Sequence, residues 1–320
     1  MKKAVLVILL VSLVRSAYAA PTGAAFLKVN PSPRSYALGS SNIASSYGAE
    51  GLYTNPANLA LTDKRYEAFS SYSSMLDGAS YSYMALGINR NTSKQHLIDG
   101  LGFSYTRMGV GDLDARDSSG QKSGSFTSQD SAFAFTGSMR LNKDLRFGMT
   151  AKGLQSEIAG FKSNRAWAVD AGLTYNMKLF NKEASFGAAL NNLGQQVGFV
   201  SEKDPLPAQL TAGLSMNLGM VKTMGAVSRG LSDQSTVLSL GAETQLGPVS
   251  LRAGYRSDSG IGSRDSGVGS GTAGMISGLT TGLGLNLKGF RLDYAVGQES
   301  ADLGVSQRAS IAFQFGRKVK

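Results

Sequence analysis

The sequence predicts an all-β protein, a transmembrane antiparallel β-barrel of about fourteen strands with an N-terminal plug segment. Apolar and polar residues alternate with a period of two through most of the chain, as they do in strands with one oily face. The alternating segments run for about ten residues, which is the length of a tilted membrane-crossing strand. Many of the 12 tyrosines and 14 phenylalanines stand near the ends of these segments, as in the aromatic girdles of membrane barrels.

Residues 1–19 predict a secretory signal peptide. Lys2 and Lys3 make a basic start, the run 4–14 is apolar apart from Ser12, and small residues at positions 17 and 19 fit a peptidase site. The apolar run is too short for a spanning helix, which needs about 20 residues. We therefore expect cleavage after Ala19 and export.

Charge and cysteine usage exclude several classes of protein. Removing Lys2, Lys3 and Arg15 lowers the formal charge from +10 to +7, and the remaining basic residues are spread singly. Nucleic-acid binding is therefore not expected, because it needs a basic cluster. The chain has no cysteine, so neither a lipid-anchored cysteine nor a disulfide can form.

The segment 249–256 illustrates the alternation. Its apolar set is Val249, Leu251, Ala253 and Tyr255, and its other set is Ser250, Arg252, Gly254 and Arg256. A soluble sandwich could bury such an apolar face against a second sheet, whereas a membrane barrel turns it to lipid. Strand length, terminal aromatic residues and charges deep within the polar face favour the barrel.

Fourteen strands are predicted between residue 65 and the C-terminus. They start near Arg65, Ala79, Ile98, Gln129, Asp144, Arg165, Ala184, Ala208, Val221, Ser235, Pro248, Met275, Gly289 and Gln307. An even number places both ends of a barrel on the periplasmic side. Short connections are expected at 141–144, 218–220, 247–248 and 288–289, and long ones at 109–128, 155–164, 193–207 and 257–274. The connection at 76–78 is shorter, and that at 89–96 longer, than this rule expects.

Residues 20–62 predict a plug inside the barrel, and residues 63–320 form the barrel itself. Prolines interrupt any helix in the segment, and several apolar residues are available to pack inside. These are Phe26, Leu27, Ile43, Leu52, Tyr53 and Leu59. The element Asn55-Pro56-Ala57 is expected to be the stiff turn that leads from the plug to the first strand, since a residue before proline avoids the helical region. The alternative is a disordered periplasmic tail.

Short motifs along nearly the whole mature chain carry a family resemblance. They are Phe26-Leu27-Lys28, Arg34, Leu38-Gly39, Ala44, the stretch 53–57, Leu59-Ala60, Lys152, Ile158, Gly160-Phe161, the stretch 168–173, Tyr175, Asn192-Leu193-Gly194, Leu206-Pro207, and the stretches 240–243, 251–255 and 292–294. Together they resemble the PorV/PorQ family within the FadL-like outer-membrane barrels. Two departures are Asn58, where the family commonly has glycine, and the five residues that follow Phe315.

The resemblance implies a fourteen-stranded barrel in the cell outer membrane with its N-terminal segment inside. PorV proteins dock and shuttle exported cargo in type IX secretion, which is the function expected first, with cargo proteins or secretion machinery and membrane lipids as partners. The alternative is a FadL-like transporter of hydrophobic compounds such as long-chain fatty acids. The inward faces offer glycine, serine, threonine and charge rather than an oily pocket, which favours docking through the loops 109–128, 193–207 and 257–274.

No enzyme activity and no cofactor are expected. The only histidine is His96, in a predicted turn, so a Cys/His site cannot form and a metal site of His and Cys is excluded. The stretch 269–274 has the dinucleotide-binding glycine pattern but no helix follows it. Asp112, Asp114 and Asp117 resemble a calcium loop that lacks its final glutamate.

Charged residues at inward-facing positions form the last predicted feature. They are Arg146, Lys152, Asp170, Glu243, Arg252, Arg291 and Asp293. Buried charges need partners, so we expect a lumen charge network that holds the plug to the wall. A charged path for a substrate is the alternative.

Overall fold

The computed structural model describes residues 22–59, 61, 64–75, 78–90, 98–199, 202–257, 278–300 and 304–318. The signal peptide, His96 and the glycine pattern at 269–274 lie outside the described residues. Within the described part, no helix is both long enough and apolar enough to cross a membrane.

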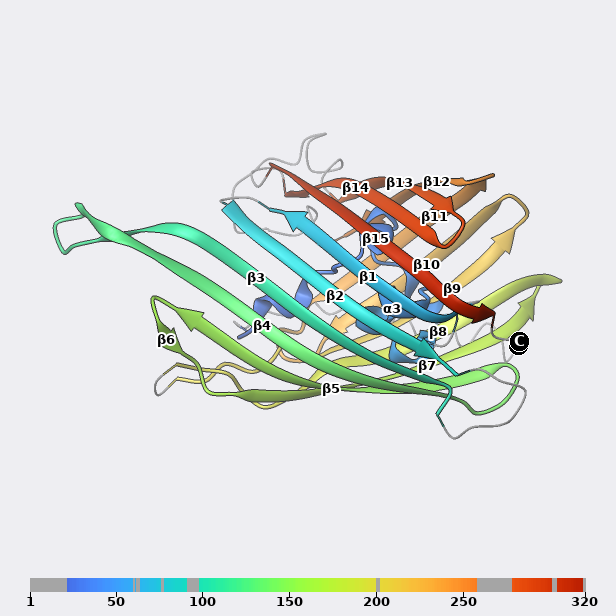
Figure 1. Ribbon diagram of the computed structural model, residues 1–320, viewed down its shortest axis with the longest axis horizontal. Helices are drawn as coiled ribbons and strands as arrows, with labels where there is room; N and C mark the ends of the chain where they lie inside the picture. The colour runs from blue at the N-terminus through green and yellow to red at the C-terminus, as the bar shows by residue number, and fades with distance from the viewer. Residues whose placement is uncertain are drawn as a thin grey trace.

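The strands form one antiparallel sheet that closes on itself (Figure 1). Their bounds are β1 (Lys64–Ser74), β2 (Ala79–Asn89), β3 (Gly100–Arg116), β4 (Lys122–Arg140), β5 (Leu145–Ile158), β6 (Phe161–Lys162), β7 (Ala166–Leu179), β8 (Lys182–Gly194), β9 (Gln209–Leu218), β10 (Val221–Gly230), β11 (Thr236–Leu246), β12 (Val249–Arg256), β13 (Leu279–Leu287), β14 (Phe290–Ser300) and β15 (Gly304–Lys318). β1 pairs with β15 and β4 pairs with β5, while β6 pairs only with the end of β5. Among the described residues, fourteen strands therefore form the ring, which confirms the predicted barrel.

The predicted loops 109–128 and 155–164 are wrong, because strands occupy most of both ranges. In place of the loop 109–128, β3 continues to Arg116 and β4 begins at Lys122, and the hairpin projects beyond its neighbours (Figure 1). The strand pairing continues to Arg116 and Lys122. Near the tip, Asp114 pairs with Lys122 at 2.6 Å, and the Asp117 carboxylate accepts two backbone hydrogen bonds in the turn. Likewise, β5 and β6 occupy much of the predicted loop 155–164.

The outer face of the barrel is apolar. Along β7, Trp167, Val169 and Tyr175 are exposed, whereas Asp170 and Thr174 are buried, which confirms the predicted alternation. Similar exposed side chains recur on the other strands, including Phe133 and Phe135 with 56% and 58% of their surface exposed. Soluble monomers rarely show apolar patches larger than a few hundred Å². This outer face therefore requires apolar surroundings.

Residues 22–59, which we call the lumenal segment, lie within the ring of strands and are drawn in blue in Figure 1. Their elements are η1 (Ala25–Lys28), α2 (Pro33–Ala37), η2 (Asn42–Ala44), α3 (Gly48–Thr54) and η3 (Pro56–Asn58). α2 contacts β12 to β15, η2 contacts β8 to β10, α3 contacts β1 to β3, and η3 contacts β4, β5 and β7. α2 and η3 each begin at a proline, and the polar side chain before the proline, Ser32 or Asn55, caps the new turn.

The lumenal segment runs from one rim of the barrel to the other. The long-loop rim carries the connections 117–121, 159–165 and 195–208, and the short-turn rim carries those at 141–144, 180–181 and 219–220. The segment starts at the long-loop rim, where the Gly23 amide donates to the Pro205 carbonyl at 3.1 Å. It ends at the short-turn rim, where β1 begins.

Candidate functional site

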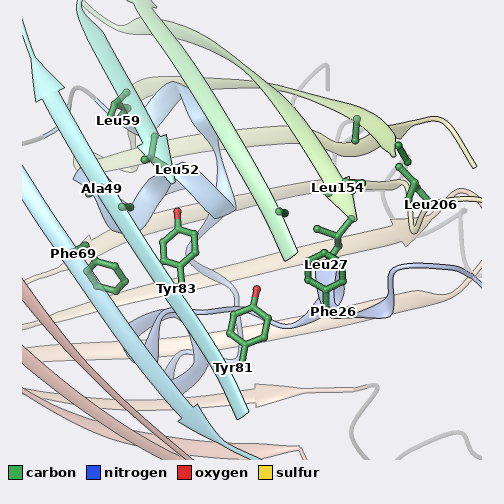
Figure 2. Close-up of a cluster of buried hydrophobic side chains, with 14 of the residues drawn as sticks. Phe26, Leu27, Ala49, Leu52, Leu59, Phe69, Tyr81, Tyr83, Leu154 and Leu206 are labelled. Atoms are coloured by element: carbon green, nitrogen blue, oxygen red, sulfur yellow. The ribbon is translucent and has the colours of Figure 1, made fainter. Parts of the chain in front are cut away.

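A buried apolar cluster joins the lumenal segment to the wall (Figure 2). Phe26 and Leu27 of η1 pack with Leu154 and Leu206, and Leu52 and Leu59 belong to the same cluster as Phe69, Tyr81 and Tyr83. Each fully buried side chain of this size stabilises the packed state by about 1.5–3 kcal/mol. Packing alone therefore provides a strong reason for the segment to stay inside.

Glycines on the wall let the backbone of the lumenal segment approach closely. A Cβ added to Gly172 of β7 would stand 2.9 Å from Cδ of Pro56, and one added to Gly148 of β5 would overlap the Pro56 peptide. Further wall glycines have the same relation to the segment, namely Gly102, Gly187, Gly241, Gly254 and Gly282. At these glycines the segment and the wall therefore touch with no room for a side chain between them.

The predicted element Asn55-Pro56-Ala57 lies against β5 and β7. Asn55 is fully buried, and its side-chain amide donates to the carbonyls of Ile43 and Leu173 and to Oγ1 of Thr174, each at 3.1 Å. Its Oδ1 accepts from the Ala57 amide at 3.1 Å. Asn55 therefore caps its own turn and bonds it to the wall.

Asn58, where the resembling family commonly has glycine, also bonds to the wall. Its Oδ1 accepts from Thr174 Oγ1 at 2.7 Å, and its amide donates to Ile43 and Ser46. The departure from the family motif is accommodated by these bonds.

Four of the predicted lumen charges form one chain across β11, β12 and β14. Arg252 binds Glu243 at 2.7 Å and Asp293 at 2.6 Å, and Arg291 binds Asp293 at 2.9 Å. The side chains of both arginines and of Asp293 are at most 6% exposed. Alternating arginines and carboxylates leave no described member of this chain without an opposite charge.

The lumenal segment adds its own charges to this chain. Arg34 binds Glu243 at 2.7 Å and Glu50 binds Arg291 at 2.6 Å, while the Tyr47 ring lies between both guanidinium groups at 4.8 and 4.7 Å. Arg34 and Glu50 therefore extend the chain of alternating charges from the wall into the lumenal segment.

Sequence reasoning missed Arg34 and Glu50 as members of the network, although a signal for them was present. Between residues 20 and 62 the only charged residues are Lys28, Arg34 and Glu50. In the structure each of the three pairs with a charged residue outside the lumenal segment. A nearly uncharged segment inside a charged wall indicates that its few charges have wall partners.

The remaining predicted charges lie apart from this chain. Lys152 binds Asp170 at 2.7 Å and donates to Asn192 Oδ1 at 2.7 Å, beside an irregularity in the β7–β8 ladder. Arg146, at the start of β5, makes no ion pair with any described residue. The seven predicted residues therefore do not form a single network, because their strand positions separate them.

A cavity of about 410 Å³ occupies the long-loop half of the lumen. Its apolar lining includes Leu27, Val29 and Val237, and its polar lining includes Asn191 and Thr211. Two further cavities lie toward the rims. One of about 500 Å³ adjoins Gly23 and the 197–204 connection, and one of about 380 Å³ adjoins Tyr47 and Gln314 at the short-turn rim.

A single ion pair ties the start of the lumenal segment to the rim of the 410 Å³ cavity. Lys28 Nζ lies 2.7 Å from Asp233, with the two side chains 44% and 9% exposed. Burial would raise the pKa of Asp233, but hydrogen bonds from Lys28 and Ser235 lower it below its usual value. Asp233 is therefore a carboxylate at neutral pH.

The fold is similar to that of several solved structures, among them a channel and a transporter. The chain matches CymD, a monoaromatic hydrocarbon channel, with 14% identity and a TM-score of 0.59 over 91% of this chain and 99% of that one. It matches the Ralstonia pickettii toluene transporter TbuX with 16% identity and a TM-score of 0.57 over 89% and 98%. It matches a Pseudomonas aeruginosa FadL homologue with 9% identity and a TM-score of 0.51 over 94% and 100%.

No family model matches the sequence, and no curated protein matches it. At these identities the structural matches concern the fold alone. The chain therefore shares the barrel fold of CymD, TbuX and the FadL homologue.

Proposed function

We propose that this chain is an outer-membrane channel that binds hydrophobic small molecules in the 410 Å³ cavity. The observation that carries this proposal is the cavity itself, inside a barrel whose fold is shared with a hydrocarbon channel and a toluene transporter. Its size falls within the usual range of about 300–1,000 Å³ for small-molecule sites. The apolar outer face faces lipid, and the lumenal segment acts as the plug.

The chemistry of the lining suggests which molecules bind. Leu27, Val29, Ile43 and Val237 provide apolar contacts. Four basic residues and one acidic residue line the same cavity, namely Lys28, Lys152, Arg256, Arg308 and Asp233. A neutral aromatic compound, or an amphiphile with an acidic head group, suits this lining better than a cation.

Mass spectrometry of the detergent-purified protein tests the proposal. Thr211 lines the cavity, so Thr211→Phe should fill part of the cavity and reduce the amount of bound compound. Ala212→Phe is the matched control, because the next residue on the same strand faces outward between the exposed Leu210 and Leu214. Equal loss of ligand in both variants, or no bound compound in the wild type after incubation with toluene or a long-chain fatty acid, would count against it.

Docking of exported proteins is the second candidate function. Structural similarity favours the hydrophobic-channel interpretation, but the β3–β4 hairpin extends past the barrel rim (Figure 1) and exposes Arg116 and Lys122. Replacing residues 111–127 by a short turn tests this role. An unchanged location and cross-linking pattern of all secreted proteins would exclude it.

A further inference from the structure

Four serines on the inner face of β1 and β15 have no hydrogen-bond partner among the described residues. They are Ser71, Ser73, Ser306 and Ser310, and their exposed fractions are 4%, 0%, 2% and 9%. Buried hydroxyl groups are almost always hydrogen-bonded, to protein or to ordered water. Four unpartnered hydroxyls on two paired strands therefore point to a ligand that the protein itself does not supply.

The strand register places these serines side by side. Ser71 lies opposite Ser310 on β15 and opposite Tyr83 on β2, and Ser73 lies opposite Arg308 and Tyr81. Cβ atoms of such cross-strand neighbours are about 4.5–5.5 Å apart. One water molecule can bond to two or three groups at this spacing, which is the coordination that buried water needs.

The serine row lies between two of the cavities. Toward the long-loop rim, Arg308, which stands between Ser306 and Ser310 on β15, lines the 410 Å³ cavity and stacks on Tyr36 with 3.6 Å between Cζ and the ring centroid. Toward the short-turn rim, beyond the last serine, Gln314 lines the 380 Å³ cavity and donates to Glu67 at 3.3 Å. Polar groups thus follow the β1–β15 seam from one cavity toward the other.

Phe69 interrupts this polar row. It is 3% exposed, lies opposite Ala312 and Ala85 in the two neighbouring ladders, and its ring centroid is 6.0 Å from that of Tyr83. Figure 2 shows Phe69, Tyr81 and Tyr83 pointing into the space beside the lumenal segment. An apolar ring offers no hydrogen bond, so water cannot bind at this level.

We propose that ordered water molecules bind the four serines along the β1–β15 seam. This water file runs from the 410 Å³ long-loop cavity toward the short-turn cavity, and Phe69 is the constriction at its far end. The file starts beside the cavity proposed for hydrophobic molecules, but the groups that hold it are the serines of the seam. It does not depend on that function.

Radiolytic hydroxyl-radical footprinting of the purified full chain tests for the water, because radicals form from water bound next to a side chain. After correction for intrinsic reactivity, Tyr81 and Tyr83 should be oxidised nearly as fast as Tyr72, which is 55% exposed. Phe26, buried in the apolar cluster, should be strongly protected. Protection of Tyr81 and Tyr83 equal to that of Phe26 would overturn the proposal.

The double variant Ser71→Ala/Ser310→Ala removes two adjacent water-binding groups. Oxidation of Tyr83 should fall in this variant and stay unchanged in Ser70→Ala, whose side chain faces outward on the same strand. Unchanged oxidation of Tyr83 in the double variant would show that these serines do not hold the water.

Osmotic swelling of vesicles that contain the protein tests the constriction. Phe69→Ser should raise water permeability above wild type, whereas Phe69→Leu keeps an apolar side chain there and should not. Equal permeability of both variants, once each is shown to be folded by heat-modifiable electrophoresis, would exclude Phe69 as the constriction. The footprinting result stands independently if Phe69→Ser does not fold.

Discussion

The two halves of the lumen hold the same segment by different means. At the short-turn half, buried charges from Arg34 and Glu50 to the wall, together with close glycine contacts, fix the chain. At the long-loop half, the segment borders the 410 Å³ cavity, and it is held by the apolar packing of Phe26 and Leu27 and by one partly exposed ion pair, Lys28–Asp233. The short-turn half therefore closes the barrel, whereas the long-loop half has room for a ligand and a weaker ionic contact with the wall.

The largest effect should come from Arg252→Ala in the closed half. The change leaves Glu243 and Asp293 with fewer opposite charges in a buried site, and breaking such a pair costs about 3–5 kcal/mol of unfolding free energy. Urea unfolding measures the loss. Arg116→Ala, which removes an exposed pair, is the control, and a similar loss there would contradict the contrast between buried and exposed charge.

A smaller effect is expected from Gly172→Val. Its side chain must displace Asn55 and Pro56, and such overpacking typically costs about 1–3 kcal/mol. Gly137→Val is the control, because a Cβ there meets no atom within 4 Å. Equal stability of the two variants, measured by the same unfolding assay, would mean that the segment does not press on β7.

Asn58→Ala should cost less again. Ile43 and Thr174 still bond to Asn55, so the loss is that of ordinary hydrogen bonds, about 0.5–1.5 kcal/mol. Asn55→Ala should be more destabilising, since the Leu173 carbonyl then loses its Asn55 donor. The reverse order would show that Asn58 is the main contact of this turn.

Lys28→Ala in the open half should have the smallest effect, about 0–1 kcal/mol, because the ion pair is partly exposed. The pKa of Asp233 is lower in the folded state than its unfolded value of about 3.9. This stabilisation is therefore present above about pH 4 and is lost as pH falls through the lower folded pKa. The stability difference between wild type and variant should shrink at acidic pH, and a constant difference would contradict this assignment.

The sequence predicts the wall better than its contents. Alternation at Trp167, Val169 and Tyr175 is local, so it identifies the outward face of β7 directly. Which charged side chains form ion pairs depends on the positions of strands that are far apart in sequence. For this reason the sequence alone does not separate Arg146, on β5, from the ion pairs of Arg252, on β12. The end of the β3–β4 hairpin projects beyond the other strands, so its residues need no apolar outer face. They therefore show little apolar alternation, and the sequence predicts a loop there.

The serines of the β1–β15 seam show the same limit. Read alone, Ser71 and Ser310 are ordinary small polar residues on an inward face. Only the closure of the ring brings them together, because they are 239 positions apart and β1 pairs with β15. A local sequence pattern therefore cannot predict which side chains lie together where β1 pairs with β15.

The enclosure of the lumenal segment has a consequence for biogenesis. α3 touches β1 to β3, which are made early, whereas α2 touches β12 to β15, which are made last. A finished cylinder would leave no gap through which this bulky, tightly fitted chain could enter sideways. We therefore expect the lumenal segment to be in position while the hairpins assemble around it. The first and last strands, β1 and β15, then pair only after the segment is enclosed.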